Sequence, residues 1–468
     1  IQLTTAPHPG WAKNYSFYDP RPQKLCALPR DWAKYRGLYL AGNRVVLSYT
    51  VGGTHILDSP WFESVDGLPV FTRTLEVSPA DETLLLRVVD LPHTGITLAA
   101  SPELTVGLLS SEKEMIGVAA LSLLEKDRAL EGAEDGFNLR IPPRTSPTTI
   151  KLLIAKVSQD NFPRFREWAK SQSGSIAKTR SLRELTTGGP GRWPALTTTG
   201  HVDRSDSPLA IDTITMPYEN PWNALLFGSG HDFFSNGDAA VATADGDVWR
   251  VNGLDESLSK ITWKRFATGL YQPLGLKIIN DKVHVLERDQ ITILHDLNNN
   301  GEADFYENFN NDTISGGGVH AYATCLETDS AGNFYFAKCS ENTPHGGTVM
   351  KVLRDGSGVE VVATGFRYPN GLGIGPGDFI TVADQQGEWV PETRLNLIQP
   401  GGFYGYMPSH HRATPPTAYD PPLCWIPRAL DNSAGAQVWI PKNHWGPLAG
   451  QMLHLSYGRC TMILILRD

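Results

Sequence analysis

Two distant segments of the chain carry the same pattern of residues. The segment Ala267-Thr-Gly-Leu-Tyr-Gln-Pro-Leu-Gly-Leu276 recurs as Ala363-Thr-Gly-Phe-Arg-Tyr-Pro-Asn-Gly-Leu372, and the two copies begin 96 residues apart. Half of that interval is 48 residues. A period of about 40–50 residues built from short strands is typical of a β-propeller, in which each unit is one four-stranded blade. The repeat therefore predicts an all-β chain folded as a ring of similar sheets.

Strand-like runs and composition support the same fold class. The chain of 468 residues contains 45 Gly, 33 Pro and only 19% charged residues, as expected for many short strands joined by turns. Apolar runs preceded by polar turns recur at 240–243, 283–286, 333–337 and 379–383, with a further strand pair near 451–457. We expect a propeller of about six to eight blades over residues 195–468, either incomplete or closed by strands from the N-terminal part.

The N-terminal part reads as a separate module. Residues 1–185 alternate like strands in several places and include one amphipathic stretch at 162–182, which predicts a β-rich module with one or two helices. Residues 186–194, Thr-Thr-Gly-Gly-Pro-Gly-Arg-Trp-Pro, exclude both helix and interior strand, so we interpret them as a linker. A chain of this length is long enough for both domains.

One twelve-residue segment has the spacing of a calcium loop. Side-chain oxygens fall at positions 1, 3, 5, 9 and 12, glycine stands at position 6, and the carbonyl of position 7 completes the set: Asp296, Asn298, Asn300, Asp304, Glu307, Gly301 and Glu302. The preceding run 291–295 alternates like a strand, so we expect a calcium clip between strands rather than a helix-loop-helix sensor. The alternative is an Asn/Asp/Gly-rich turn without an ion.

Polar residues near the strand ends of a propeller converge on its axis. His320 is predicted as a general base, with Arg288 and Arg367 as anion or quinone ligands and Asp384 as a neighbouring carboxylate. Further binding candidates are His231, Asn370, Trp389 and Tyr404. The alternatives are a structural histidine at a strand start for His320 and a brace between blades, through Asp384, for Arg367.

Several classes of function are excluded or disfavoured by the sequence. The net charge of −9 leaves no broad basic face for nucleic acid, and no apolar run is long enough for a membrane span. The five cysteines include no Cys-x-x-Cys, which argues against a zinc or thiol-redox site. Cys325 and Cys339 flank a predicted hairpin, so a disulfide and two buried thiols are both open.

The segment at 363–372, the loop at 296–307 and the run from His320 to Tyr335 resemble the soluble quinoprotein glucose/sorbosone dehydrogenase-type propellers. The resemblance covers residues 195–468. Segments at 37–54, 219–222 and 246–249 also resemble large bacterial multidomain proteins described as sugar dehydrogenases, which are often fused to a cytochrome c.

This resemblance implies a calcium-containing propeller with pyrroloquinoline quinone on its axis and a carbohydrate substrate. It also implies that His320 abstracts the hydroxyl proton, that Arg367 lies near the quinone, and that a cytochrome c accepts electrons. The lysine and paired arginines that the family uses for the quinone have no convincing counterpart, because Arg367 stands alone in its motif and Lys338 falls inside a strand.

Three functions follow as competing hypotheses. The first is a sugar dehydrogenase-like oxidoreductase with a structural calcium, and the second is a polysaccharide lyase or glycoside-cleaving enzyme that uses the same pocket. The third is a non-catalytic propeller that binds carbohydrate or protein. The calcium loop favours an extracytoplasmic location, periplasmic or secreted, because millimolar calcium keeps a weak site filled.

Overall fold

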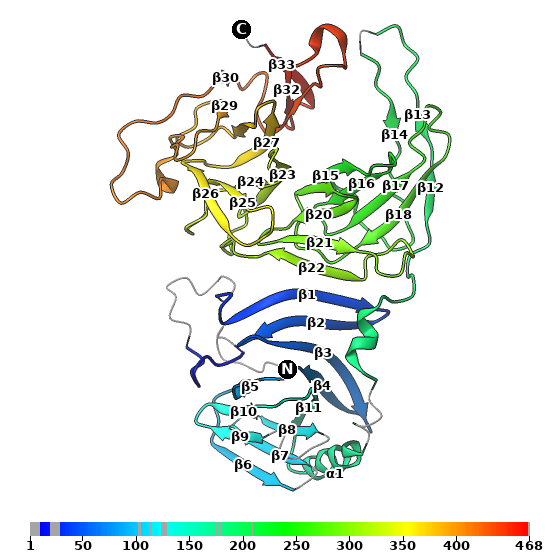
Figure 1. Cartoon of the computed structure of the whole chain (residues 1–468), viewed down its shortest axis with the longest axis vertical. Coiled ribbons are helices and arrows are strands. Elements are labelled where there is room, and N and C mark those ends of the chain that lie inside the picture. The colour runs from blue at the N-terminus through cyan, green and yellow to red at the C-terminus, as the bar shows by residue number, and fades with distance from the viewer. Residues whose placement is uncertain are drawn as a thin grey trace. The chain divides into compact units, whose positions relative to one another are not determined.

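The computed structural model describes residues 10–18, 29–101, 104–112, 114–122, 129–174, 176, 180–207 and 209–466. The chain divides into two compact units (Figure 1). The first comprises the chain up to Pro190 together with Asp296–Asn300 and Asp304–Glu307, and the second comprises Gly191–His295, Gly301–Ala303 and Asn308–Asp468. The division falls inside the segment interpreted as a linker. Cys26 lies outside the described residues.

The first unit consists of two antiparallel sheets. The larger sheet has the order β1-β2-β3-β4-β11-β8-β7-β6, and the smaller one has the order β5-β10-β9. The bounds are β1 Ala33–Ala41, β2 Arg44–Val51, β3 Thr54–Val65, β4 Leu68–Val77, β5 Leu84–Asp90, β6 Gly95–Ala100, β7 Thr105–Ser110, β8 Met115–Ser122, β9 Ala129–Ala133, β10 Gly136–Ile141 and β11 Thr148–Val157. β1 also pairs with the segment Phe305–Glu307. Buried aliphatic side chains from both sheets, among them Ile56, Leu86 and Leu139, form one core.

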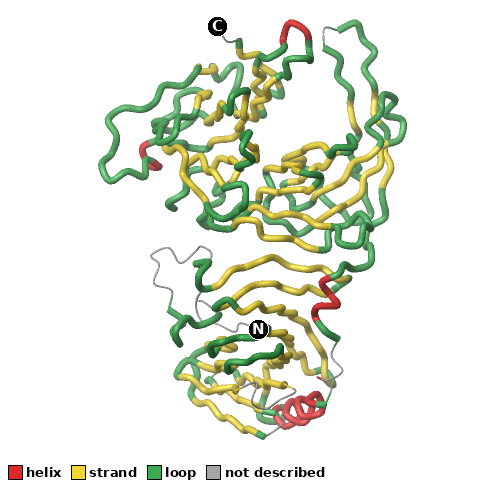
Figure 2. The backbone as a smooth tube through the Cα atoms, in the orientation of Figure 1, coloured by secondary structure: helices red, strands yellow, loops and turns green. Residues whose placement is uncertain are grey.

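Helix α1 covers part of the larger sheet in the first unit (Figure 2). It spans Phe162–Ser173 and buries Phe165 and Ala169 against strand residues that include Leu153 and Val106. The amphipathic stretch predicted a helix as far as residue 182, but the helix ends before Gly174. A short 3-10 helix, Leu182–Thr186, follows.

The second unit is built from five consecutive antiparallel sheets of a β-propeller. The first four inner strands are β15 Gly228–Phe233, β19 Gly275–Ile279, β23 Ala323–Thr328 and β27 Pro369–Gly375, and the fifth is β31 Ala434–Trp439. The outer strands are β16 Ala239–Thr243, β17 Val248–Asn252, β18 Ile261–Ala267, β20 Lys282–Leu286, β21 Ile291–His295, β24 Phe334–Lys338, β25 Thr348–Val352, β26 Val359–Thr364, β28 Phe379–Asp384, β29 Thr393–Leu397, β30 Cys424–Ile426, β32 Met452–Ser456 and β33 Thr461–Ile465. Successive inner strands pack against one another in chain order. The predicted fold class is confirmed.

Short elements complete the strand inventory of the described residues. Strand β12, Leu196–Thr198, pairs with the outer strand β18, and β13 Gly200–His201 pairs with β14 Thr213–Ile214. Strand β22 spans Phe305–Asn310. The described residues supply five blades, fewer than the six to eight predicted. Strands β1–β11 pair with one another and with Phe305–Glu307, all within the first unit, rather than closing the ring.

The repeated segment is explained by backbone geometry. Gly269 and Gly365, equivalent in the repeat, have φ angles of +84° and +86°, which residues with a Cβ rarely adopt. Gly275 and Gly371, also equivalent, lie where the next inner strand approaches closely. A Cβ on Gly275 would come within 2.7 Å of the backbone of Cys325, and one on Gly371 would collide with the carbonyl of Gly435. The glycines therefore permit the close packing of inner strands around the axis.

The apolar runs that located the blades are second strands, not inner strands. Strands β16, β20, β24 and β28 are almost wholly buried, because they are covered on both faces by neighbouring blades. The inner strands are richer in glycine and polar residues. Accordingly, His231 lies within the first inner strand, and Asp384 ends the second strand of the fourth blade.

No helix in the described part of the chain is both long and apolar enough to cross a membrane. Cys325, Cys339, Cys424 and Cys460 are free thiols. The disulfide considered between Cys325 and Cys339 does not form, because the β23–β24 hairpin pairs Thr328 with Phe334 and Thr324 with Ala337, a register in which the two cysteines are not opposite each other.

Candidate functional site

Most predicted site residues lie at one end of the blades. We call this end the entry face: it is where the inner strands begin and, because adjacent strands are antiparallel, where the second strands end. Strands β23 and β27 bring His320 and Arg367 to it, since both residues directly precede an inner strand. Arg288 follows the second strand β20, and Asp384 and Trp389 lie at and after the end of β28. The topology thus brings these five residues to the same end of the second unit.

An aromatic and cationic cluster occupies the entry face beside the third and fourth blades. The ring centroids of His320 and Tyr368 are 5.3 Å apart, and those of His320 and Tyr322 are 6.0 Å apart. The guanidinium carbon of Arg367 lies 4.4 Å from the centre of the Tyr368 ring. Arg367 also donates one hydrogen bond to the carbonyl of Gln386, at 3.3 Å. His320 is exposed, so its imidazole is open to a ligand from solvent.

A tight turn after β28 carries an exposed tryptophan next to this cluster. Gly387 and Val390 exchange two backbone hydrogen bonds, which leaves Glu388 and Trp389 at the tip. Trp389 is 57% exposed and has a φ of +66°. A left-handed conformation is strained at a bulky residue, so the surrounding turn must hold Trp389 in place. Gly387 packs directly under the Arg367 guanidinium, where a Cβ would collide with it.

Tyr406 joins the cluster from the long segment between β29 and β30. It shares a side-chain hydrogen bond with Ser340 and lies close to the charges of Glu388 and Arg367. Burial, followed by the negative charge of Glu388, raises the pKa of the Tyr406 phenol. The phenol therefore stays protonated at neutral pH and can donate a hydrogen bond.

Arg288 is buried and its side chain is fully committed within the protein. Its guanidinium donates to the carbonyls of Ala321 (3.0 Å) and Gly318 and to the side-chain oxygen of Gln272 (3.1 Å). The sequence predicted Arg288 as a ligand for anions or a quinone. In the structure its guanidinium instead donates hydrogen bonds to carbonyls of the loop that carries His320.

Lys338 lies beneath the same loop and is inaccessible to solvent. Its ammonium donates to the hydroxyl of Ser315 at 2.6 Å and forms an ion pair with Glu341 at 3.1 Å. Glu341 also accepts the amide of Gly316 at 2.7 Å. Burial lowers the pKa of Lys338, while the Glu341 carboxylate opposes that shift. Lys338, like Arg288, therefore makes its polar contacts with other residues of the protein, and its charge is paired with that of Glu341.

Asp384 is inaccessible to solvent and caps the start of the fourth blade. Its two carboxylate oxygens accept the backbone amides of Arg367 and Tyr368, both at 2.9 Å. Burial raises the pKa of Asp384 to about 6. Asp384 thus fixes the main chain of Arg367 and does not face a ligand.

Three further candidates lie away from the cluster. Asn370 donates to the carbonyl of Ala434 at 2.7 Å and ties two inner strands together. Tyr404 is fully buried, and its hydroxyl donates to the carbonyl of Leu397 at 2.6 Å. His231 is exposed on β15 and lines a cavity instead of the entry face.

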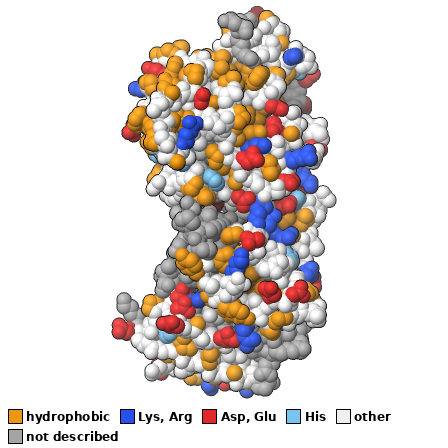
Figure 3. All heavy atoms as spheres, turned by 60° about the vertical axis from the view of Figure 1, so that its left-hand side comes forward, with side chains coloured by type: hydrophobic (Ala, Val, Ile, Leu, Met, Phe, Trp, Pro, Cys, Tyr) orange, Lys and Arg blue, Asp and Glu red, His pale blue; other side chains and the backbone are white. Residues whose placement is uncertain are grey.

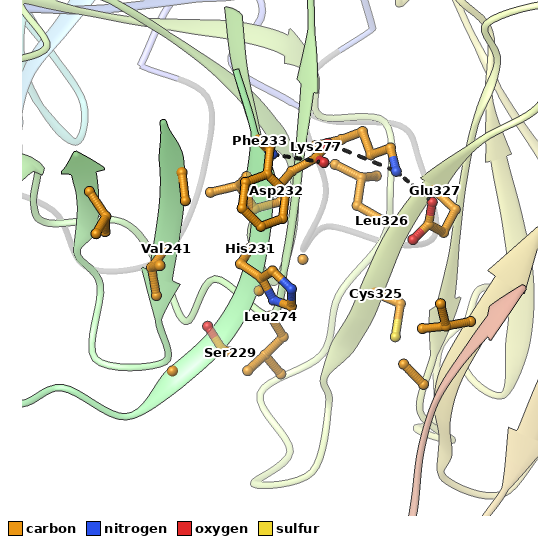
Figure 4. Close-up of a pocket in the computed structure, with 18 of the residues that line it drawn as sticks. Ser229, His231, Asp232, Phe233, Val241, Leu274, Lys277, Cys325, Leu326 and Glu327 are labelled. Carbon is orange, nitrogen blue, oxygen red and sulfur yellow. Dashed lines mark hydrogen bonds and ion pairs between the residues drawn. The ribbon is translucent and has the colours of Figure 1, made fainter. Parts of the chain in front are cut away.

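The cavity has a volume of about 740 Å³ and lies among the inner strands of the second unit (Figure 4). Its walls are mainly apolar, with Phe233 and Leu276 on one side and Val438 on another. One cation lies between two carboxylates at its margin, because Lys277 pairs with Glu327 at 2.8 Å and lies 3.9 Å from Asp232. It is bounded by the first and the last described blades, β15 and β31, and this explains why the inner-strand residues His231 and Phe233 are exposed. We therefore place the candidate site on the entry face.

The surface of the second unit also carries wide apolar areas with scattered charges on the side that Figure 3 shows. Exposed large apolar side chains of this unit include Trp389, Tyr419, Leu423 and Trp425. Sequence reasoning assigned no role in the site to Tyr368 or Glu388. The signal that could have identified them is local: Tyr368 follows Arg367 in the repeated segment, and Glu388 stands in the turn that exposes Trp389.

Four of the predicted calcium donors, all in the first unit, surround one short turn. The amide of Asn300 lies 3.1 Å from Asp296 Oδ1 and 3.2 Å from Asn298 Oδ1, so these two oxygens converge on one point. Asp304 accepts the amides of Leu297 at 3.0 Å and Gly189 at 2.8 Å. The donor set contains oxygen alone, as calcium requires. Within the described ranges, no three His, Cys, Asp or Glu side chains form a metal-binding group. Two of these four donors are asparagines, which such a group does not include.

The other two predicted calcium ligands are Glu307 and Glu302, and their surroundings differ from those of the four donors. Glu307 lies in β22 opposite Gly37, about 10 Å beyond Asp304 along an extended strand. The Glu302 carboxylate, within the second unit, accepts the ammonium of Lys264 at 2.7 Å and the amides of Arg192 and Trp193 at 2.8 Å each. Burial alone would raise the pKa of Glu302, but these donors outweigh it and lower the pKa below its usual value. The side chain of Glu302 thus ties the segment at Arg192 and Trp193 to strand β18, which carries Lys264.

Comparison with known proteins gives no family for the whole chain. Residues 1–58 match a family model described as a domain of unknown function, DUF6797. No curated protein matches the chain.

Similar solved structures include three sugar dehydrogenases. An oxidoreductase described as a glucose dehydrogenase, from Thermus thermophilus, is 15% identical with a TM-score of 0.38, and the match covers 52% of this chain and 80% of that one. The PQQ-bound aldose sugar dehydrogenase from Streptomyces coelicolor is 13% identical with a TM-score of 0.36, over 59% of this chain and 86% of that one. The PQQ domain of pyranose dehydrogenase from Coprinopsis cinerea is 9% identical with a TM-score of 0.40, over 51% of this chain and 74% of that one.

Proposed function

We propose that the entry face binds a carbohydrate and oxidises one of its hydroxyl groups. The observation that supports this proposal is the cluster in which His320 and Arg367 both contact the Tyr368 ring, at 5.3 and 4.4 Å, beside the exposed Trp389. A sugar ring offers an apolar face that an indole can cover and hydroxyls that guanidinium and phenol groups can bind. In this reaction the hydroxyl proton passes to His320 and a hydride leaves the same carbon for a diffusible two-electron acceptor, such as the dye of the assay below, which is reduced as the alcohol becomes a carbonyl.

The experiment is a dye-reduction assay of the purified chain over a panel of aldoses and oligosaccharides. The H320Q variant should reduce kcat by roughly 10²–10⁴-fold, the usual contribution of a general base, while sugar binding is retained. Absence of oxidation by the wild type over the whole panel would contradict the proposal. Quinone-independent cleavage of a uronic-acid polymer would favour the lyase hypothesis instead.

The described residues do not fit a tightly held pyrroloquinoline quinone, which carries three carboxylates. A tricarboxylate in a protein needs several cations whose charge is not already neutralised and whose hydrogen-bond donors are not already used by other groups. Arg288 is committed to Gly318, Ala321 and Gln272, and Lys338 is committed to Glu341 and Ser315. Arg367 is then the remaining cation of the cluster. We therefore assign no resident quinone, and added quinone should leave the rate of dye reduction unchanged. A cytochrome c as the final acceptor remains a prediction from the resemblance.

A second candidate function is carbohydrate binding without catalysis. One observation favours it: the His320 imidazole makes no side-chain hydrogen bond to any described residue, whereas a catalytic base is commonly oriented by a third group. In that case H320Q would bind sugars with wild-type affinity and neither protein would reduce the dye.

We also propose that calcium binds the turn formed by Asp296, Asn298, Asn300 and Asp304. Support comes from the oxygen-only donor set and from the convergence of Asp296 and Asn298 on a single amide. In this role calcium would stabilise the first unit. A weak site of this kind would stay filled outside the cytoplasm, which is where we place the protein.

A further inference from the structure

We propose that Arg288 is a positioning residue that holds the His320 loop, Ser315–Ala321, and thereby sets the place of the imidazole on the entry face. The expected effect of Arg288 on catalysis rests on the function proposed above. The inference that Arg288 holds the loop in place does not depend on that function. Arg288 belongs to the turn between β20 and β21, in a different blade from β23, which the loop precedes. The turn of one blade therefore holds the loop at the start of the next.

The side chain of Arg288 holds the loop on both sides of His320. Nε donates to the carbonyl of Ala321, the residue after His320, at 3.0 Å. Nη2 donates to the carbonyl of Gly318, two residues before it. Because the guanidinium is planar with fixed donor directions, one side chain can hold two carbonyls at once, which a lysine ammonium does poorly. The backbone on either side of His320 is thus fixed to one rigid group.

The main chain of Arg288 holds the other end of the loop. Its carbonyl accepts the hydroxyl of Ser315 at 3.0 Å and lies 3.4 Å from the ammonium of Lys338. Its amide donates to the carbonyl of Tyr271 at 3.0 Å, which fixes the turn in place. Arg288 therefore contacts the loop at three points: Ser315, Gly318 and Ala321.

The composition of the loop explains why it needs these ties. Gly316, Gly317 and Gly318 stand in a row, and glycine loses more backbone entropy on ordering than any other residue. Gly317 and Gly318 are exposed, as is His320. Packing therefore contributes little to the order of this segment, and the hydrogen bonds to Arg288, together with the Glu341 contact to Gly316, must supply it.

The test is amide hydrogen exchange of the whole chain for wild type, R288K and the control R265K. Arg265 is also a largely buried arginine of the second unit, but it pairs with Asp247 and Thr268 and not with the loop. R288K should accelerate exchange in peptides that cover residues 315–321 by about tenfold or more, and R265K should leave those peptides unchanged. Equal exchange of the loop in wild type and R288K would overturn the inference.

S315A provides a milder variant in case R288K folds poorly, because it removes the tie at one end only. It should accelerate exchange at 315–317 and leave 320–321 protected. In the dye-reduction assay, R288K should lower kcat by about 10–100-fold with KM changed less than threefold, and its pH profile should differ from that of R265K. If the wild type proves inactive on every sugar, the proposed function fails, while the exchange data still decide whether Arg288 holds the loop.

Discussion

The ring centroids of His320 and Tyr368 lie 5.3 Å apart, although the two residues precede the inner strands of different blades. Tyr368 also lies under the guanidinium of Arg367, at 4.4 Å. One phenol ring thus links the candidate base to the candidate anion ligand. Buried side chains fix the backbone at both neighbours of Tyr368: Arg288 fixes the loop that carries His320, and Asp384 fixes the main chain of Arg367.

The repeated glycines are expected to be essential for packing of the inner strands. G371A should unfold the second unit or destabilise it by more than about 3 kcal/mol, because φ is +102° and the new Cβ would collide with the carbonyl of Gly435. G237A, at a φ of +88° with nothing within 4 Å, is the matched control and should cost about 1 kcal/mol. Urea unfolding of both variants measures the difference. If both variants lose the same free energy of unfolding, backbone strain and not the collision with Gly435 accounts for the destabilisation.

Glu302 should contribute strongly to the stability of the second unit. E302Q leaves the ammonium of Lys264 with the carbonyl of Trp193 but without its partner of opposite charge, and we expect a loss of roughly 2–4 kcal/mol in the free energy of unfolding. The pKa of Glu302 is lowered in the folded state, so its contribution is present above the unfolded pKa and is lost as pH falls through the folded pKa. E360Q, which breaks the more exposed pair with Lys351, should cost less than about 1 kcal/mol. A similar cost for both variants at pH 7 would contradict the burial argument.

Asp384 should give a pH dependence of the opposite sign. Its folded pKa is raised by burial to about 6, so the folded state holds the proton more tightly than the unfolded chain does. Stability from this group is therefore highest below about pH 4 and declines as pH rises to about 6. D384N cannot ionise, so its stability relative to wild type should improve between pH 4 and pH 7 by on the order of 1–3 kcal/mol. A difference between the two proteins that stays constant over that range would refute the raised pKa.

Calcium should stabilise the first unit through the turn at Asp296. Addition of calcium should raise the Tm of the wild type, and a chelator should lower it, because a ligand that binds only the folded state stabilises it. D296N removes one of the two charged donors and should abolish most of this dependence. E307Q serves as the comparison, since the structure places Glu307 in β22 about 10 Å from Asp304. If both variants lose the calcium dependence of Tm equally, Glu307 is a calcium ligand after all. If the Tm of the wild type does not respond to calcium, the proposed calcium site is wrong.

The propeller could be predicted from the sequence because the backbone geometry of each blade requires glycine at fixed positions, and these positions repeat along the chain. Gly269 and Gly365 share a left-handed φ, and Gly275 and Gly371 share a close strand contact, so each blade of the pair carries the same residues. Strand identity was harder to predict, because the most apolar runs are second strands covered on both faces, such as β24 and β28.

For the candidate site, the sequence could predict placement: the positions of His320, Arg367 and Trp389 before inner strands or in a turn follow from topology. The roles of Arg288 and Glu302 do not follow from the sequence. Arg288 binds backbone carbonyls 30 and 33 residues away, and Glu302 binds Lys264 and amides 109 and 110 residues away. Loop conformation and blade packing, not residue type, determine these partners.

The most direct test of the entry face as the carbohydrate site compares two tryptophans. Trp389 and Trp445 are 57% and 50% exposed and have φ angles of +66° and +57°, so they are matched in exposure and in backbone strain. Trp445 lies between β31 and β32, at the opposite end of the blades from the turn between β28 and β29. The measurement is calorimetric titration of W389A and W445A with the sugar that the wild type binds. We predict that W389A weakens Kd by about tenfold, near 1.4 kcal/mol, while W445A stays within about twofold of wild type. Equal affinity of both variants, or a larger loss for W445A, would contradict the assignment of the site to this face.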